Sequence, residues 1–231
     1  EEYRREFLGN ISHELKTPLF TVQGYLDTLI EGGAIKDKTL RVKYIERASK
    51  GVERLISIVQ DLDMISKFEV GDLNLEVTKF DIIVEIQNVF DLLEMKADAK
   101  NIILMFDEKY ISPIQVYADK DKIQQVLTNL VMNSIKYGKE NGTTEISIER
   151  INKNKVLVRI QDNGDGIEQQ HLSRIFERFY RISKSGSREE GGSGLGLAIV
   201  KHIIEAHNEK IFVQSTPQKG SEFSFTLKTS K

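Results

Sequence analysis

The sequence predicts two structural parts: an antiparallel helical hairpin that would form a dimeric four-helix bundle, and then an α/β sandwich with helices on one face of a mixed sheet. Over the first 68 residues, apolar side chains recur at steps of three and four, which is the period of an α-helix. From residue 72 onward, short alternating runs and helical runs follow one another, as in an α+β domain. We therefore expect one domain over residues 1–68 and a second over residues 72–231.

The first domain contains two apolar stripes that a short break separates. One stripe consists of Phe7, Ile11, Leu15, Leu19, Val22, Leu26 and Leu29. The other consists of Leu40, Ala48, Val52, Leu55, Val59, Leu62 and Ile65. Residues 31–38 include two adjacent glycines, so the two helices should reverse direction there and pack as neighbours. Two helices cannot enclose stripes of this length, whereas four can, and a homodimer is therefore expected.

The second domain should combine helices with short strands. We expect helices over residues 82–99, 119–138 and 195–207, and strands over residues 73–77, 102–106, 114–117, 144–151, 155–162, 210–216 and 221–227. Asp119 suits the N-cap of the middle helix, and Gly138 suits its end. Asn208 can take the left-handed position after the last helix, where glycine is more common.

The composition of the 231-residue chain excludes several classes of function. Hydrophobic residues make up 39% and charged residues 29%, as in ordinary globular proteins. The net charge of -2 is not that of a nucleic-acid-binding surface, so no nucleic-acid partner is expected. The chain has no cysteine, which excludes disulfides, thiolate nucleophiles and cysteine metal sites. No stretch approaches the ~18 apolar residues of a membrane span.

The segment FLGNISHELKTPL places a histidine on a helix. On an ideal wheel of ~100° per residue, His13 lies roughly 160° from the centre of the apolar stripe, with Thr17 and Phe20 beside it. If Glu14 accepts the Nδ1 proton of the imidazole, the Nε2 lone pair is free to attack an electrophile. Pro18 cannot donate to the carbonyl of Glu14, so the helix should bend there. An ordinary solvated histidine is the alternative that the wheel leaves open.

This segment resembles the phospho-acceptor box of sensor histidine kinases, of the H-E-x-x-T-P type, and four further motifs follow in the order of that family. The resemblance covers nearly the whole chain. It implies that His13 accepts a phosphoryl group and that Glu14 orients its imidazole. It also implies that the pattern extending to Thr17 can support the reverse control step, in which a response regulator is dephosphorylated.

The segment NLVMNSIKY resembles the asparagine box of the kinase ATP-binding domain. On the wheel, Asn129, Asn133 and Lys136 share the helix face opposite the apolar residues. Amide oxygens suit a magnesium ion and an ammonium suits phosphate, whereas the alternative is an ordinary solvated face. The resemblance implies that Asn133 ligates Mg2+ and that Asn129 supports it. It further implies that Lys136 meets phosphate and that Tyr137 lines the nucleotide pocket.

The segment DNGDGI resembles the first glycine box of the family, although the string alone is also ordinary turn chemistry. The resemblance implies that Asp162 accepts a hydrogen bond from the adenine amino group, while Gly164 and Gly166 let the backbone approach the base. GGSGLGLAIV resembles the second glycine box, which implies nucleotide contacts from Gly192, Gly194, Leu195 and Gly196. These glycines precede a helix, whose N–H groups can receive phosphate. KGSEF resembles the last glycine box.

The segment IFERFYR resembles the phenylalanine box. The resemblance implies that Phe176 and Phe179 anchor a lid over the nucleotide, with a simple core role as the alternative for at least one of them. Arg181 matches the position that reaches the γ-phosphate, and Arg178 is a weaker candidate. The lid would be the glycine- and serine-rich run over residues 183–194.

Together these motifs imply the cytoplasmic catalytic core of a sensor histidine kinase, which uses ATP and Mg2+ and passes the phosphoryl group to an aspartate of a response regulator. The chain starts without Met, so we expect a fragment of a membrane-anchored parent whose only membrane contact is through upstream segments. Two alternatives belong to other classes. One is a Bergerat-type ATPase of the chaperone, topoisomerase or mismatch-repair kind, which would lack the acceptor helix. The other is a non-catalytic dimeric adaptor, against which the intact asparagine and glycine boxes argue.

Overall fold

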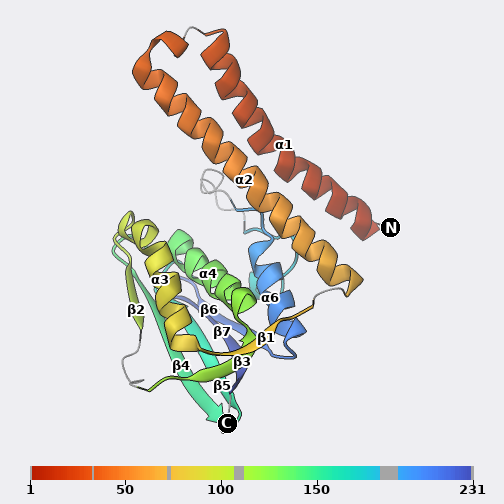
Figure 1. The fold of residues 1–231 in the computed structure, drawn as a ribbon, viewed down its shortest axis with the longest axis vertical. Helices are drawn as coiled ribbons and strands as arrows, with labels where there is room; N and C mark the ends of the chain where they lie inside the picture. Colours follow the sequence, from red (N-terminus) through yellow and green to blue (C-terminus); the bar gives the residue numbers. More distant parts are fainter. Residues whose placement is uncertain (1, 33, 72–73, 107–111, 183–191, 230–231) are drawn as a thin grey trace. The chain divides into compact units, whose positions relative to one another are not determined.

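The computed structural model describes residues 2–32, 34–71, 74–106, 112–182 and 192–229 (Figure 1). The chain divides into two compact units, Glu1–Gly71 and Asp72–Lys231. No helix in these described ranges is both long enough and apolar enough to cross a membrane.

The first unit is an antiparallel hairpin of two long helices, as predicted (Figure 1). Helix α1 (Glu2–Ile30) and helix α2 (Lys38–Val70) are joined through a 3-10 turn, η1 (Ala34–Lys36). Asp37 caps α2, because its side chain accepts two backbone N–H groups of the first turn. Gly71 ends α2 with a left-handed φ of 71°.

The apolar residues of the hairpin are divided between two faces. One face is buried between the helices and includes Pro18, Leu29, Ala48, Gly51, Ile58 and Ile65. The other face lies open on the single hairpin and includes Leu19, Leu26, Ile45, Val52, Ile56 and Val59. Each helix has only one neighbour within the hairpin and can bury only part of its apolar stripe against it. The rest of the stripe therefore lies open.

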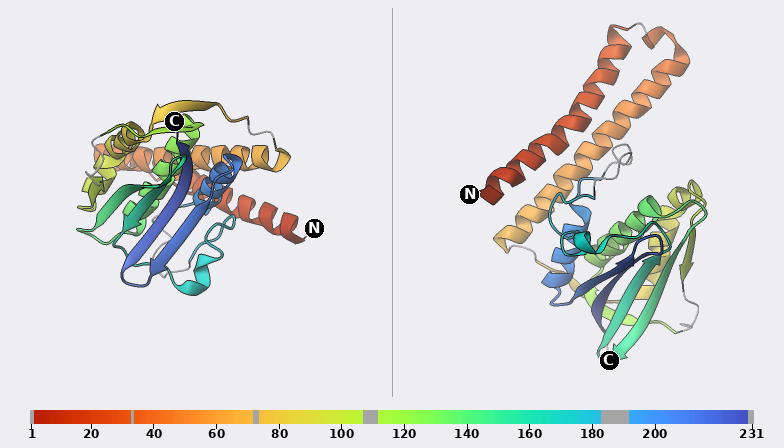
Figure 2. Two further views of the ribbon diagram at one scale, coloured as in Figure 1. Left: turned by 90° about the horizontal axis from the view of Figure 1, so that it is seen from below. Right: turned by 180° about the vertical axis from the view of Figure 1, so that it is seen from behind.

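The second unit is a mixed sheet with helices on one face, as predicted (Figures 1 and 2). Its strands are β1 (Val77–Asp81), β2 (Ile103–Phe106), β3 (Gln115–Asp119), β4 (Thr143–Asn152), β5 (Lys155–Asp162), β6 (Ile211–Thr216) and β7 (Gly220–Thr229). Their order is β1-β3-β7-β5-β4-β2, with β6 paired to β7. Among the described strands, β2 and β4 run parallel and the other neighbours are antiparallel.

The covering layer consists of α3 (Ile82–Asp98), α4 (Lys120–Tyr137) and α6 (Gly196–Ala206), while α5 (Gln169–Leu172) is a single turn (Figure 2). Alternate residues of β5 face this layer and are buried, and the apolar side of α4 is buried with them. Because the apolar side of α4 packs in the core, its polar side points away from the core and is available to contact a ligand.

The roles predicted for three residues at helix ends are confirmed. Asp119 accepts the N–H of Lys122 at 3.1 Å at the start of α4, and Gly138 is the C-cap of that helix. Asn208 has a left-handed φ of 56° after α6. The strand expected over residues 73–77 is wrong in its bounds: residues 74–76 form no strand, and β1 covers Val77–Asp81. Val77 pairs with Asp119, the last residue of β3, so β3 offers no partner to the residues before Val77. Residue 73 lies outside the described ranges.

Candidate functional site

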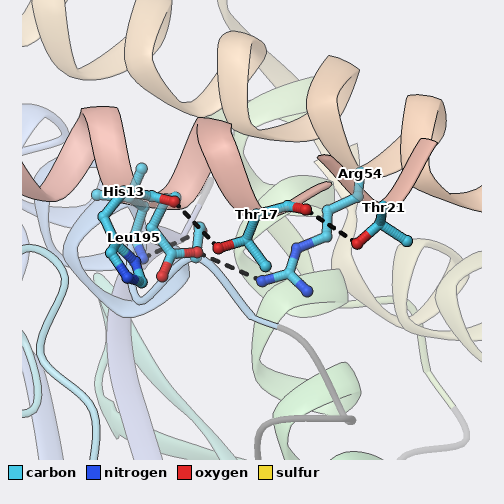
Figure 3. A network of polar contacts seen from close by, with 7 residues as sticks. His13, Thr17, Thr21, Arg54 and Leu195 are labelled. Carbon is cyan, nitrogen blue, oxygen red and sulfur yellow. Dashed lines mark hydrogen bonds and ion pairs between the residues drawn. The ribbon is translucent and has the colours of Figure 1, made fainter. Parts of the chain in front are cut away.

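His13 lies on the exposed side of α1, as the wheel predicts (Figure 3). The Thr17 hydroxyl donates to the His13 carbonyl oxygen at 3.2 Å, and the Thr21 hydroxyl donates to the Thr17 carbonyl oxygen at 2.9 Å. Helix α1 runs through Pro18 as one element. Phe20 is 63% exposed, so it does not belong to the hairpin core.

Glu14 is bound by a residue of α2 that the sequence analysis did not identify. The Arg54 guanidinium donates from Nη2 to Oε2 of Glu14 at 3.3 Å (Figure 3). The two side chains are 30% and 16% exposed, so water reaches this ion pair only in part. Forty positions separate the two residues, and no local sequence pattern reports such a contact. The role of Glu14 as orienter of the imidazole stays a prediction.

Asp162 is the centre of a backbone hydrogen-bond node at the end of β5. Its Oδ1 accepts the N–H of Gly164 at 2.8 Å and the N–H of Ser221 at 3.2 Å. Its Oδ2 accepts no hydrogen bond from the part of the chain that the structure describes. Burial raises the pKa of Asp162, and the two backbone N–H groups oppose that shift. The node therefore leaves one carboxylate oxygen available to a ligand.

Glycines are required around this node because other backbone segments pass too close for a side chain. A Cβ at Gly164 would lie 2.6 Å from the Tyr137 carbonyl oxygen. Gly166 has a left-handed φ of 69°, and a Cβ there would lie 2.1 Å from the Thr216 carbonyl oxygen. The first glycine box thus joins the end of α4 to the β6–β7 hairpin.

The polar side of α4 meets the segment that precedes α6. Asn129 donates from Nδ2 to the Gly196 carbonyl oxygen at 3.4 Å. A Cβ at Gly192 would lie 2.9 Å from the ammonium nitrogen of Lys136, which shows how closely the second glycine box passes this lysine. The structure therefore brings together the predicted residues of the asparagine box and of the second glycine box.

Asn133 and Tyr137 lie on the same stretch of α4. Asn133 is half-buried, and its side chain makes no hydrogen bond within the described ranges. The Tyr137 side chain is exposed, and its ring centroid lies 4.8 Å from the Lys136 ammonium. Across the residues that the structure describes, no group of three or more histidines, aspartates or glutamates could hold a metal ion. A divalent ion at Asn133 would depend on the oxygens of a ligand.

The phenylalanine box is joined to the second glycine box through the backbone. Phe179 has a φ of 62°, and its N–H donates to the Gly194 carbonyl oxygen at 2.9 Å. A Cβ at Gly194, where φ is 72°, would lie 2.8 Å from the backbone of Phe179. Phe176 instead packs edge-on against Phe223, with ring centroids 6.3 Å apart. This contact favours the core role for Phe176, and the role of Phe179 as lid anchor stays a prediction.

The remaining predicted residues occupy different environments. The Leu195 side chain is fully buried, so only its backbone can meet a nucleotide, and its N–H donates to the Ser193 hydroxyl at 3.2 Å. Arg178 and Arg181 are half-buried. Most of the expected lid, residues 183–191, lies outside the described ranges.

Two family models match the chain. The model described as the His Kinase A (phospho-acceptor) domain matches residues 3–71, and the model described as the histidine kinase-, DNA gyrase B- and HSP90-like ATPase matches residues 118–231. The sensor histidine kinase WalK of Bacillus subtilis is 36% identical over 229 residues, which is 98% of this chain and 37% of that protein. The chain thus spans little more than a third of this relative's length.

Solved structures of histidine kinases have the same fold. The Acinetobacter baumannii histidine kinase AdeS covers 95% of this chain, with a TM-score of 0.75, 28% identity and 98% of its own chain matched. The catalytic domain of histidine kinase ThkA is 32% identical over 67% of this chain and 96% of its own, with a TM-score of 0.58. ThkA in complex with the response regulator TrrA covers 97% of this chain and 61% of its own, with a TM-score of 0.74 and 26% identity. The chain belongs to the sensor histidine kinases of two-component systems, and it comprises their phospho-acceptor hairpin and ATP-binding domain.

Proposed function

We propose that this chain is an ATP-dependent protein histidine kinase that phosphorylates His13 and then transfers the phosphoryl group to an aspartate of a response regulator. The observation that carries the proposal is the exposed His13 within its H-E-x-x-T-P sequence, in a chain that also contains the Asp162 node of an ATP-binding domain. Neither feature alone specifies kinase activity, because the ATPase family is broad and histidines are common.

Nucleotide binding follows from the chemistry of the node and of α4. The available Oδ2 of Asp162 would accept a hydrogen bond from the adenine amino group, while the Gly164 N–H holds the carboxylate through Oδ1. The Lys136 ammonium and the N-terminal N–H groups of α6 would meet the phosphates.

Magnesium suits this site because the half-buried Asn133 offers an amide oxygen that has no partner in the described structure. When bound, the ion would neutralise charge on the phosphate oxygens. Asn129 would support this arrangement from one turn away while it holds Gly196.

Several residues of the chain would each take a separate role in the phosphorylation step. The Nε2 atom of His13 attacks the γ-phosphorus in line, and the bond from that phosphorus to the β,γ-bridging oxygen breaks, so ADP leaves with the electron pair. The Nδ1 proton passes to Glu14 and then to water. Arg181, with Arg178 as the weaker candidate, would stabilise the charge on the transferring group.

A second copy of the chain is proposed to cover the open apolar face of the hairpin. Ile45, Val52, Ile56 and Val59 are each more than 40% exposed and recur at steps of seven, four and three along α2. This spacing is that of a helical-bundle seam, and exposed apolar rows of this length need a partner. Ile56→Glu should therefore give monomers in analytical ultracentrifugation, whereas a dimer of unchanged affinity would refute this interface.

A response regulator is the proposed acceptor, as ThkA, one of the related kinases, forms a complex with one. The exposed Thr17 and Phe20 beside His13 suit a docking surface for that partner. Thr17 would also position water for removal of the phosphoryl group from the regulator.

The test is incubation of the purified chain with magnesium and ATP labelled at the γ-phosphate. The expected product is one labelled histidine, stable in alkali and lost in acid, and absent from His13→Gln. Release of inorganic phosphate without protein labelling would instead support a Bergerat-type ATPase. Binding of ATP with neither labelling nor hydrolysis would support the non-catalytic adaptor.

A further inference from the structure

The carboxylate next to the proposed phosphorylation site is held from the opposite helix. The Nη2 atom of Arg54 lies 3.3 Å from Oε2 of Glu14, and these side chains are 30% and 16% exposed. A guanidinium is always charged and presents a planar fork of donors, so it fixes the direction of a carboxylate as well as its charge.

The two helices pack closely beside this ion pair. Gly51, one turn before Arg54, is buried against α1. A Cβ at this glycine would lie 2.6 Å from Cγ2 of Val22 and 3.5 Å from the carbonyl oxygen of Pro18. The helices therefore pack tightly at Pro18 and Val22, next to the H-E-x-x-T-P sequence, and this packing favours the register that pairs Arg54 with Glu14.

We propose that Arg54 is a positioning residue for phosphorylation of His13 and that it acts through Glu14; this inference rests on the proposed kinase function. Arg54 binds one oxygen of the Glu14 carboxylate and restricts its rotamers, so that the carboxylate stays directed for the Nδ1 proton of His13. Without Arg54, the Glu14 carboxylate loses this ion pair and the restriction that the pair places on its rotamers. The imidazole then spends less time in the tautomer that presents its Nε2 lone pair.

The test compares Arg54→Met, Arg54→Lys, Glu14→Gln and the Arg54→Met/Glu14→Gln double variant in the same chain. The initial rate of histidine labelling is measured against ATP concentration, and thermal unfolding is followed in parallel. Arg54→Met should lower kcat by roughly ten- to a hundredfold and leave KM for ATP unchanged, the range expected for loss of a charge-assisted hydrogen bond. Arg54→Lys should recover part of the rate, because it keeps the charge but loses the fork.

The double variant separates action through Glu14 from a general structural effect. If Arg54 acts through Glu14, Arg54→Met causes no further loss of rate once Glu14 is glutamine. Arg47→Met is the matched control, since Arg47 also reaches across the hairpin from α2, donating to the Tyr25 hydroxyl at 3.1 Å. Its labelling rate should equal that of the wild-type chain.

Three results would overturn the proposal: an Arg54→Met rate within twofold of wild type, additive losses in the double variant, or an equal loss in Arg47→Met. If Arg54→Met unfolds, Arg54→Lys decides the question, because an unchanged rate at an unchanged melting temperature rejects the positioning role. Absence of labelling in the wild-type chain would refute the proposed kinase function itself, which is a separate outcome.

Discussion

Replacing Asp162 by asparagine should reverse the hydrogen-bonding polarity of the proposed adenine site while it preserves the fold. Oδ1 of Asp162 accepts N–H groups from Gly164 and Ser221, and an amide oxygen can accept both in the same way. These two donors fix the orientation of the amide, which places Nδ2 where the available Oδ2 was. A donor would then face the adenine amino group, which is also a donor.

The expected loss of affinity follows from this mismatch. A hydrogen bond to a charged acceptor contributes about 1.5–3 kcal/mol. Its loss should weaken binding of a non-hydrolysable ATP analogue by roughly ten- to 150-fold. A guanine nucleotide presents an acceptor oxygen in place of the amino group, so the preference of the site for adenine over guanine should narrow or reverse.

The fold should tolerate the substitution because the carboxylate is itself unfavourable at neutral pH. Burial raises the pKa of Asp162 in the folded state above its ordinary value of 3.8. At pH values between 3.8 and the raised pKa, the folded state therefore binds more protons than the unfolded state. The contribution of Asp162 to stability therefore falls as the pH rises through that window. At pH 7 the Asp162→Asn protein should be at least as stable as the wild-type chain, and it should lose that part of the pH dependence.

Calorimetric titration with adenine and guanine nucleotide analogues, together with thermal unfolding at several pH values, measures both effects. Asp98→Asn, at the exposed end of α3, is the matched carboxylate-to-amide control. An affinity for the adenine analogue within threefold of wild type would show that Asp162 does not contact the base. Weaker binding together with a much lower melting temperature would show that the node supports only the fold.

Three further substitutions test the other proposed roles. Asn133→Ala should abolish magnesium-dependent labelling of His13 while the protein remains a dimer, and normal labelling in this variant would remove Asn133 from the metal site. Thr17→Ala should spare autophosphorylation but slow the loss of phosphate from a phosphorylated regulator, and equal damage to both reactions would mean that Thr17 only supports the helix through its bond to the His13 carbonyl. Phe20→Ala should weaken phosphotransfer to the regulator with little change in melting temperature, because the ring is 63% exposed; a strongly lowered melting temperature with unchanged regulator affinity would defeat the docking role.

Features fixed by neighbouring residues could be predicted from the sequence. The cap at Asp119, the left-handed Asn208 and the exposed position of His13 each depend on a few adjacent side chains and on helical periodicity. The helical wheel did not separate the two apolar faces of the hairpin. It gives one average direction for all apolar side chains, whether they contact the neighbouring helix or face away from it. The Arg54–Glu14 pair was missed for a related reason, since the register between two helices is set by packing at sites such as Gly51.

The glycine boxes show how motifs that are separate in the sequence depend on one another. The last box donates the Ser221 N–H to Asp162 of the first box, and a Cβ at Gly220 would lie 1.9 Å from the Asp162 carbonyl oxygen. In the second box, the Gly194 carbonyl oxygen likewise accepts the N–H of Phe179. Phe179 is a bulky residue whose positive φ is unfavourable by itself, and the missing side chain of Gly194 leaves room for its backbone. Each box therefore has two functions: the nucleotide contacts proposed for it, and the close approach that lets distant backbone segments bond. The second function explains why these positions must be glycine even where no ligand would touch them.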